Sequence, residues 1–249
     1  MRVAVLSDIH GNCIALESVL ADLVHNPVEK LVCLGDAVQG GPQPAEVVSR
    51  LRQLGCPVVM GNADAWLLSG VDTGNEITSE ERKLELDDVR DWSLAHLSDE
   101  DKGFIGSFYP TVEVELEDGR SLLCFHGSPT SFDDILLPDT PQEQFFKLLG
   151  VYDAEALAGG HTHVQYVRRI GNDGRIFFNP GSIGLAYSHH QPDESFRADP
   201  WAEYAVLTSE SERLALEFRR TPYDVAPLID VYKSSGRPYA DKAVVQYGS

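Results

Sequence analysis

Positive charge is scarce in this chain of 249 residues. Its 20 lysine and arginine residues stand against 39 aspartate and glutamate residues, which gives a net charge of −19. Broad binding to nucleic acid or to an anionic membrane requires a basic surface, so this balance argues against both and against a nuclease. A single phosphate ester is not excluded, because bound cations can invert the field inside one site.

Cysteine and long apolar runs are scarce as well. The four cysteines form no C-x-x-C pair, and Cys33 and Cys124 lie in apolar runs, where a thiol usually packs as a small buried hydrophobe. No run approaches the roughly 18 apolar residues of a membrane helix. The chain opens on an apolar run without a charged leader, so we expect a cytoplasmic protein that does not bind membranes.

The first 60 residues alternate between short apolar runs and amphipathic segments. The runs at 3–6, 31–34 and 57–60 predict buried strands, and the apolar spacing within 14–25 and 42–54 predicts helices. Strands that alternate with helices in this way indicate a parallel sheet with crossover helices.

Residues 64–108 interrupt this alternation. A short helix is expected at 63–68, and Thr78-Ser79-Glu80-Glu81 fits a capping box for an acidic helix that runs to about residue 97. We interpret the segment as a helical excursion over the site, within one domain that spans 1–249. A solvated surface helix is favoured over a lid.

The second half of the chain is mainly strand. Asp118-Gly119 predicts a hairpin turn. Alternating or apolar runs predict strands at 111–117, 121–125, 156–158, 164–170, 175–178, 203–208 and 213–219, with helices ending near 149 and starting near 225.

Five of the strand-like runs end in side chains that can bind metals. Asp8 and His10 are two residues apart, a spacing that puts side chains on one side of extended backbone, and His161 and His163 repeat it. Ligands of open α/β sheets bind beyond the carboxyl ends of strands, so these groups gather if the strands are neighbours. The set is Asp8, His10, Asp36, Asn62, His126, His161 and His163.

This mixture of carboxylates, imidazoles and one amide suits Mn, Fe or Zn better than Ca or Mg alone. Seven ligands exceed the needs of one ion, and two ions that share a bridging carboxylate account for all of them. Taken alone, Asp8 and His10 are equally compatible with a hydrogen-bonded pair that caps the next helix.

The ordered set of motifs resembles the calcineurin-like metallophosphoesterases. The match covers residues 3 to about 184, and its last motif is typical of the bacterial branch of small phosphodiesterases. The matching segments are Asp8-Ile9-His10-Gly11-Asn12, Gly35-Asp36, Gly61-Asn62, His126-Gly127, Gly159-Gly160-His161-Thr162-His163 and Asn179-Pro180-Gly181-Ser182.

This resemblance implies an α/β fold, a two-sheet β-sandwich flanked by helices in a four-layer αββα arrangement. It also implies two divalent ions, Mn above all, with Fe, Zn and Ni compatible. Asp36 would bridge them. The first ion would be held by Asp8, His10, Asp36 and His163, and the second by Asp36, Asn62, His126 and His161.

The implied activity is hydrolysis of phosphodiesters or activated phosphomonoesters by a metal-bridging water or hydroxide. Asp36 and Asn62 would act in catalysis, and Asn12 would either contact a phosphate oxygen or, as favoured, only cap a helix. The alternative is a catalytically weak metal-binding interaction scaffold. The expected partner is a small phosphate ester rather than nucleic acid, and the sequence specifies neither the natural substrate nor the oligomeric state.

One motif departs from the family. Many relatives carry a His after Gly-Asn, where it contacts the phosphate or protonates the leaving group, but this chain has Ala63 there, followed by Asp64. We expect Asp64 to cap the following helix. Gln39 is a candidate pocket residue, and Trp66 is expected in the core. The polar loop that follows the last motif is expected to be solvated, and it contains Tyr187, His189 and His190.

Overall fold

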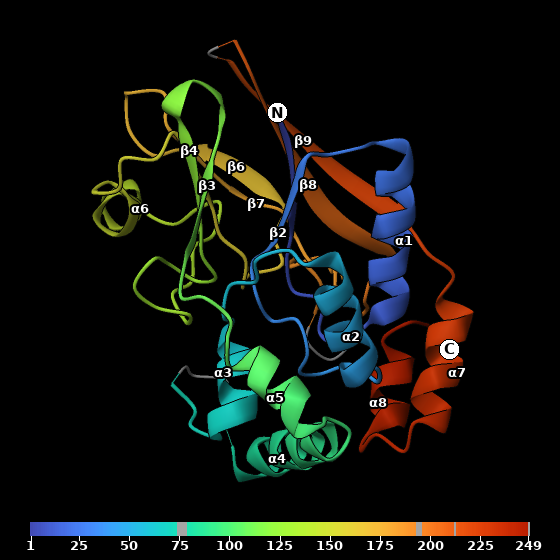
Figure 1. Ribbon diagram of the computed structural model, residues 1–249. Helices are drawn as coiled ribbons and strands as arrows, with labels where there is room; N and C mark the ends of the chain where they lie inside the picture. The colour runs from blue at the N-terminus through green and yellow to red at the C-terminus, as the bar shows by residue number, and fades with distance from the viewer. Residues whose placement is uncertain (74–78, 193–195, 212, 249) are drawn as a thin grey trace.

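In the computed structural model, residues 1–73, 79–192, 196–211 and 213–248 are described, and they form two facing β-sheets with helices outside them (Figure 1). The strands are β1 (Arg2–Leu6), β2 (Lys30–Cys33), β3 (Val112–Glu115), β4 (Ser121–Cys124), β5 (Ala156–Ala158), β6 (Tyr166–Arg169), β7 (Ile176–Asn179), β8 (Trp201–Glu210) and β9 (Arg213–Pro222). The helices are α1 (Cys13–His25), α2 (Pro44–Leu54), α3 (Asn62–Ser69), α4 (Glu80–Ala95), α5 (Asp99–Ile105), α6 (Gln142–Leu149), α7 (Val225–Ser234) and α8 (Ala240–Val245).

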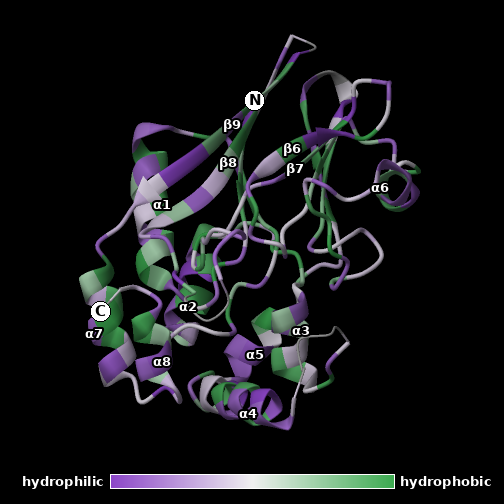
Figure 2. Ribbon diagram, turned by 180° about the vertical axis from the view of Figure 1, so that it is seen from behind, coloured by the Kyte–Doolittle hydropathy of each residue, from purple (hydrophilic) through white to green (hydrophobic). Residues whose placement is uncertain are grey.

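The two sheets are both mixed. The first has the order β2-β1-β8-β9, in which β1 runs parallel to β2 and antiparallel to β8. The second has the order β3-β4-β5-β7-β6, with a parallel centre formed by β4, β5 and β7. The edge strand β9 carries hydrophilic side chains (Figure 2), as expected for an edge that avoids pairing with other chains.

Side-chain alternation along the strands builds the layers. Val3 and Val5 of β1 enter the core between the sheets, together with Leu122 and Cys124 of β4. The alternate side chains of β1 face the outer side of the sheet, where Leu6 packs in a cluster that includes buried residues of α1 and α2. A third cluster joins the outer face of the second sheet to α6. The layers are therefore helix, sheet, sheet and helix, which confirms the predicted four-layer fold.

Several predicted elements differ in detail. The expected strand at 57–60 is reduced to two isolated bridges, Cys33 to Val58 and Val59 to Tyr109. The expected hairpin turn is a 3-10 turn, Glu117–Gly119. The expected capping box lies partly outside the described residues, and Ser79 caps α4 by accepting from the Arg82 amide. The helices α5 and α8 are absent from the sequence-based prediction.

The excursion forms α3, α4 and α5, which lie below the sheets in Figure 1, beside the carboxyl-terminal pair α7 and α8. The pair packs on the rest of the chain through a cluster that includes Leu228 and Val244 and touches Ile14 of α1. Among the described residues, no helix combines the length and the apolar character needed to cross a membrane.

Candidate metal centre

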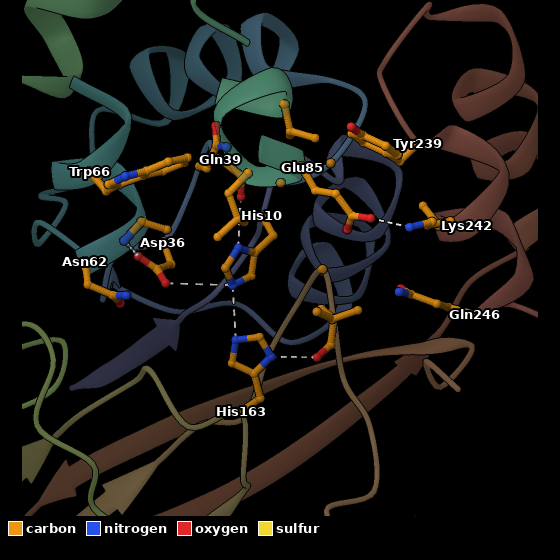
Figure 3. A pocket seen from close by; sticks show the side chains of 18 of the residues that line it. His10, Asp36, Gln39, Asn62, Trp66, Glu85, His163, Tyr239, Lys242 and Gln246 are labelled. Carbon is orange, nitrogen blue, oxygen red and sulfur yellow. Dashed lines mark hydrogen bonds and ion pairs between the residues drawn. The ribbon is translucent and has the colours of Figure 1, made fainter. Parts of the chain in front are cut away.

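The loops that follow the strands bring the predicted ligands together. Asp8 and His10 lie between β1 and α1, and Asp36 lies between β2 and α2. His10, Asp36, Asn62 and His163 face one another at the carboxyl ends of the strands (Figure 3). Backbone hydrogen bonds join the first two loops, from Asp8 N to Gly35 O at 3.0 Å and from His10 N to Asp36 O at 2.8 Å. The two loops are thereby held as one unit.

The ligand residues do not sit in extended backbone. Five of the seven have positive φ angles, between 46° and 67°, in the left-handed region that non-glycine residues rarely adopt. The extended geometry assumed for the two i, i+2 pairs is therefore wrong, although the side chains do converge. The five are Asp8, His10, Asp36, His161 and His163.

Close backbone approach requires glycine at position 61. A Cβ atom there would lie 2.0 Å from Oδ1 of Asp36 and 2.2 Å from its backbone nitrogen. Any side chain would therefore push the Asp36 loop away from α3. The amide of Ala63 donates to the same Oδ1 at 2.8 Å, which fixes the carboxylate.

Three residues form a first cluster. His163 Nε2 lies 3.4 Å from Asp8 Oδ1, and His10 Nε2 lies 3.9 Å from the same oxygen. The Nε2 atoms of His10 and His163 are 3.1 Å apart. These three ligand atoms lie close enough together to bind one ion.

A second cluster consists of Asp36, His126 and His161. Asp36 Oδ2 is 3.3 Å from His126 Nε2, and it is also 3.8 Å from His10 Nε2 of the first cluster. Asn62 adds its Oδ1 at 2.9 Å from His126 Nε2. The same oxygen of Asp36 thus lies within reach of both clusters.

Backbone carbonyls orient three imidazoles. The Nδ1 atoms of His10, His126 and His163 lie 2.9, 2.8 and 2.8 Å from the carbonyls of Gln39, Leu34 and Leu185. A carbonyl only accepts, so each Nδ1 carries a proton, and each ring presents the lone pair of Nε2 to the clusters when it is neutral.

The clusters also shift one another's pKa values. Burial alone would raise the pKa of Asp36, but the charge of His126 and its hydrogen bond hold it below the ordinary range. Burial alone would lower the pKa of His126, whereas Asp36 raises it to about 10. Burial and the charge of His126 lower the pKa of His161. Without cations, the site therefore retains protons that metal binding would displace.

This donor set fits divalent cations. Asp8 Oδ1 is buried and has no hydrogen-bond partner among the described residues. When the rings are neutral, as metal ligands are, the Nε2 lone pairs of His10 and His163 face each other at 3.1 Å, and those of His126 Nε2 and Asn62 Oδ1 do so at 2.9 Å. Two facing acceptors repel each other unless a proton or a metal ion lies between them. A bound cation therefore stabilises this arrangement of side chains.

Side chains that are not metal ligands hold the ligand loops through hydrogen bonds to their backbone. Asn179 donates to Gly160 O at 2.7 Å, and Ser182 Oγ donates to Asp8 O at 2.8 Å, which gives the Asn-Pro-Gly-Ser motif a structural role. We expected Asp64 to cap α3, but it does not. Its carboxylate accepts from the amides of Ala37 and Val38, both at 3.0 Å, and so holds the chain that follows Asp36.

A cavity of about 530 Å³ opens beside the clusters, lined by ligands and by residues of the excursion. Gln39 lines it, as predicted. Trp66 also lines it and is only half-buried, so its assignment to the core is wrong. The helix α4 contributes Arg82 and Glu85 to this lining, while residues 80–84 are exposed, as predicted for a surface helix.

The structure also places Asn12 and the polar loop that contains Tyr187, His189 and His190. Asn12 is the N-cap of α1, accepting from Ala15 N at 3.0 Å while its amide donates to Gly184 O at 3.1 Å, so the favoured cap role is confirmed. His189 and His190 are exposed, as predicted. Tyr187 instead lines the cavity, with its ring centroid 5.7 Å from that of His163.

The carboxyl-terminal helices also line the cavity, a placement that the sequence did not reveal. The cavity is lined by Arg237, Tyr239 and Lys242 from the α7–α8 turn and α8. The one available signal was the pairing of a basic residue with tyrosine in Gly236-Arg237-Pro238-Tyr239, which by itself indicates only a turn.

Comparisons with known proteins agree with this geometry. A family model described as the calcineurin-like phosphoesterase superfamily domain matches residues 1–207. An uncharacterized protein of Methanocaldococcus jannaschii, MJ0912, is 26% identical over 238 residues, which cover 90% of this chain and 88% of that protein. A solved metallophosphoesterase from Sphaerobacter thermophilus is 25% identical with a TM-score of 0.71, covering 99% of this chain and 98% of that one. The hypothetical protein PH1004 from Pyrococcus horikoshii shares the fold, with 21% identity, a TM-score of 0.77 and coverage of 100% and 98%.

Proposed function

Because the chain belongs to the calcineurin-like phosphoesterase superfamily, we propose that it hydrolyses phosphate esters with two divalent cations, and that phosphodiesters and activated monoesters are its substrates. In this proposal Asp8, His10, Asp36 and His163 hold the first ion. Asp36, Asn62, His126 and His161 hold the second. Mn²⁺ is the cation that we expect.

The position of Asp36 carries this proposal. Its Oδ1 is held by the amide of Ala63, and its Oδ2 lies 3.3 Å from His126 and 3.8 Å from His10, which belong to different clusters. An oxygen that faces both clusters is what a bridging carboxylate requires. An ordinary structural ion pair would need only one of them.

The chemistry divides between the cations and the chain. Two bound divalent ions would acidify a water molecule and stabilise charge on the phosphoryl oxygens during in-line attack. The chain's own residues orient the ligands: the carbonyls of Gln39 and Leu34 hold His10 and His126, and Asp64 holds the backbone after Asp36. Ala63 offers no proton to the leaving group, so leaving groups that depart as anions are favoured.

The cavity supports a small-molecule substrate. Its volume of about 530 Å³ suits one organic phosphate, and the net charge of −19 disfavours stable binding of nucleic acid. We propose a cytoplasmic location, because the four scattered cysteines are free thiols and a reducing compartment keeps thiols in this state.

Turnover decides between hydrolase and scaffold. The protein is stripped of metal, reloaded with Mn²⁺ and assayed in one preparation with bis(p-nitrophenyl) phosphate and p-nitrophenyl phosphate. We expect hydrolysis that depends on two Mn²⁺ ions per chain and is lost in His126→Ala, while the exposed His96→Ala keeps full activity. Two bound ions without turnover of either ester would refute the proposal and favour the scaffold.

A further inference from the structure

The carboxyl-terminal helices form one wall of the cavity, although they lie beyond residue 207, where the family match ends. Tyr239, Lys242 and Gln246 approach the cavity from one side, and Trp66 of α3 lies on the opposite side (Figure 3). Two side-chain contacts join this wall to α4: Lys242 forms an ion pair with Glu85, and the Tyr239 hydroxyl donates to Asp88 at 2.7 Å. Substrate contacts on this wall would therefore lie outside the part of the chain that the family model matches.

Arg237 is a preorganised cation in this wall. Its Nε donates to Gly40 O at 2.7 Å, its Nη1 donates to Pro238 O at 2.8 Å, and its guanidinium carbon lies 5.5 Å from the ring centroid of Tyr232. Within the described part of the chain, no carboxylate forms an ion pair with it, although it is half-buried. A half-buried guanidinium without a counter-ion is costly unless a ligand supplies the charge.

A second guanidinium faces the same space. Arg82 of α4, an exposed residue, also lines the cavity, and its positive charge adds to the effect of burial in lowering the pKa of Arg237. Among the described residues, Arg82 forms an ion pair with Glu85, at 3.9 Å, and Glu85 is also paired with Lys242. Arg82 and Lys242 thus share one carboxylate, and Arg237 forms no ion pair with any described carboxylate.

We propose that Arg82 and Arg237 bind a second phosphate group of the substrate, one carried by the organic group whose reacting phosphate lies at the metal clusters. The inference rests on the proposed function and narrows it to phosphate esters with two separated phosphates. Planar guanidinium groups bind phosphate through paired N–H donors, and an anion between Arg82 and Arg237 removes their mutual repulsion. The local cations make this possible in a protein of net charge −19.

The test compares two substrates with the same reacting bond. They are the p-nitrophenyl ester of thymidine 5′-phosphate and the same ester with an added 3′-phosphate. For the Mn²⁺-loaded wild type we expect kcat/KM to be about tenfold or more higher for the 3′-phosphorylated ester, since hydrogen bonds to charged groups are the strong ones. Arg82→Gln and Arg237→Gln should each bring this ratio close to one.

Controls separate recognition from damage. Arg50→Gln removes an arginine of α2 that pairs with Glu17 outside the cavity, so it changes net charge equally and should leave the ratio unchanged. Within the part of the chain that the structure describes, the Arg82 side chain forms no hydrogen bond to the backbone. Arg82→Gln therefore remains informative if the loss of the Arg237 contact to Gly40 impairs folding. A wild-type ratio near one, or a ratio that both variants retain, would overturn the inference while hydrolysis still supports the proposed function.

Binding provides a readout without turnover. Calorimetry should find thymidine 3′,5′-bisphosphate bound about tenfold or more tightly than thymidine 5′-phosphate by the Mn²⁺-loaded protein, with the difference lost in Arg82→Gln. If no ester is hydrolysed at all, the proposed function fails, and this difference alone decides the inference. Equal affinities for the two nucleotides would refute it.

Discussion

The Nε2 atoms of His10 and His163 lie 3.1 Å apart, and the Nδ1 atom of each ring faces a backbone carbonyl. When neutral, both rings therefore direct a lone pair at the same point, beside Oδ1 of Asp8, which has no hydrogen-bond partner among the described residues. Three acceptors that converge on one point are stable together only when a proton or a cation joins them. The stability of this protein should consequently depend on its metal content and on pH.

Metal removal should lower the melting temperature. At a free metal concentration of about 100 times Kd, the bound state is stabilised by about 2.7 kcal/mol, which for a chain of this size corresponds to roughly 5–10 °C. Calorimetry of the chelated and Mn²⁺-reloaded protein measures the shift. An unchanged melting curve after elemental analysis has verified metal removal would contradict a metal-bound native state.

The metal-free protein should also lose stability as the pH rises. The pKa of His126 is 6.5 in the unfolded chain, and although burial would lower it, Asp36 raises it to about 10 in the folded state. A raised folded pKa gives stability that is fully present below about pH 6.5 and is lost as the pH rises through about 10. The metal-loaded protein should show no such loss, because its imidazoles bind metal as neutral groups. Melting temperatures between pH 6.5 and 10 test this.

A histidine control isolates that effect. His126→Gln should flatten the slope of the metal-free protein between these pH values, whereas the exposed His96→Gln should retain it. Equal slopes in His126→Gln and in the wild type would show that other groups cause the pH dependence.

Asp36→Asn should weaken both metal sites together. Its Oδ2 lies within 3.3 Å of His126 and 3.8 Å of His10, so the loss of its charge leaves two cations facing each other without a shared anion. His163→Ala should weaken mainly the first site. Elemental analysis and Mn²⁺ titration of both variants distinguish the two patterns, and Asp36→Asn with two tightly bound ions and normal turnover would rule out the bridge.

The outline of the fold and the ligand positions were predictable from local pattern. The apolar runs at 3–6 and 121–125 predict buried strands, and the structure packs Val3, Val5, Leu122 and Cys124 in the core between the sheets. Ligands after strand ends follow from the turn chemistry of α/β sheets. The family resemblance and the four-layer arrangement are accordingly confirmed, whereas the metal identity and the role of each ligand remain predictions.

Features that depend on partners far apart in the chain were not predictable. Asp64 binds the amides of Ala37 and Val38, which lie 27 and 26 residues away, and no local pattern marks this. Trp66 has an apolar ring at helical spacing, but only the arrangement of α3 and α8 makes it a cavity residue. The run at 57–60 has strand composition, yet it forms only isolated bridges because tertiary context decides pairing.

Asp64→Ala should destabilise the protein and the metal centre together. It leaves two buried backbone N–H groups without acceptors, at a cost of about 1–3 kcal/mol each. The loop after Asp36 should loosen, so Mn²⁺ affinity should fall as well. Denaturant unfolding and metal titration measure both effects, with the exposed Asp99→Ala as the matched control. Unfolding free energy and Mn²⁺ affinity that match those of Asp99→Ala would show that Asp64 does not hold this loop.

The absence of a histidine at position 63 should appear in the leaving-group dependence of the rate. A general acid contributes roughly 10²–10⁴-fold when the leaving group is poor. Ala63 lines the cavity and supplies only its backbone amide, which binds Asp36. We therefore expect wild-type rates to fall steeply as leaving-group pKa rises across a series of aryl and alkyl diesters, measured under conditions where chemistry limits turnover.

Ala63→His keeps the backbone donor to Asp36 and adds an imidazole beside the clusters, so it should flatten that dependence and improve turnover of poor leaving groups. Tyr187→Phe provides the comparison, because Tyr187 also lines the cavity and could deliver a proton in place of the missing histidine. If Tyr187→Phe, or removal of His189 or His190, abolishes activity only with poor leaving groups, that residue serves as the general acid in place of a histidine at position 63. Wild-type rates that do not vary with leaving-group pKa would contradict the prediction directly, because proton delivery would then be complete without a residue at position 63.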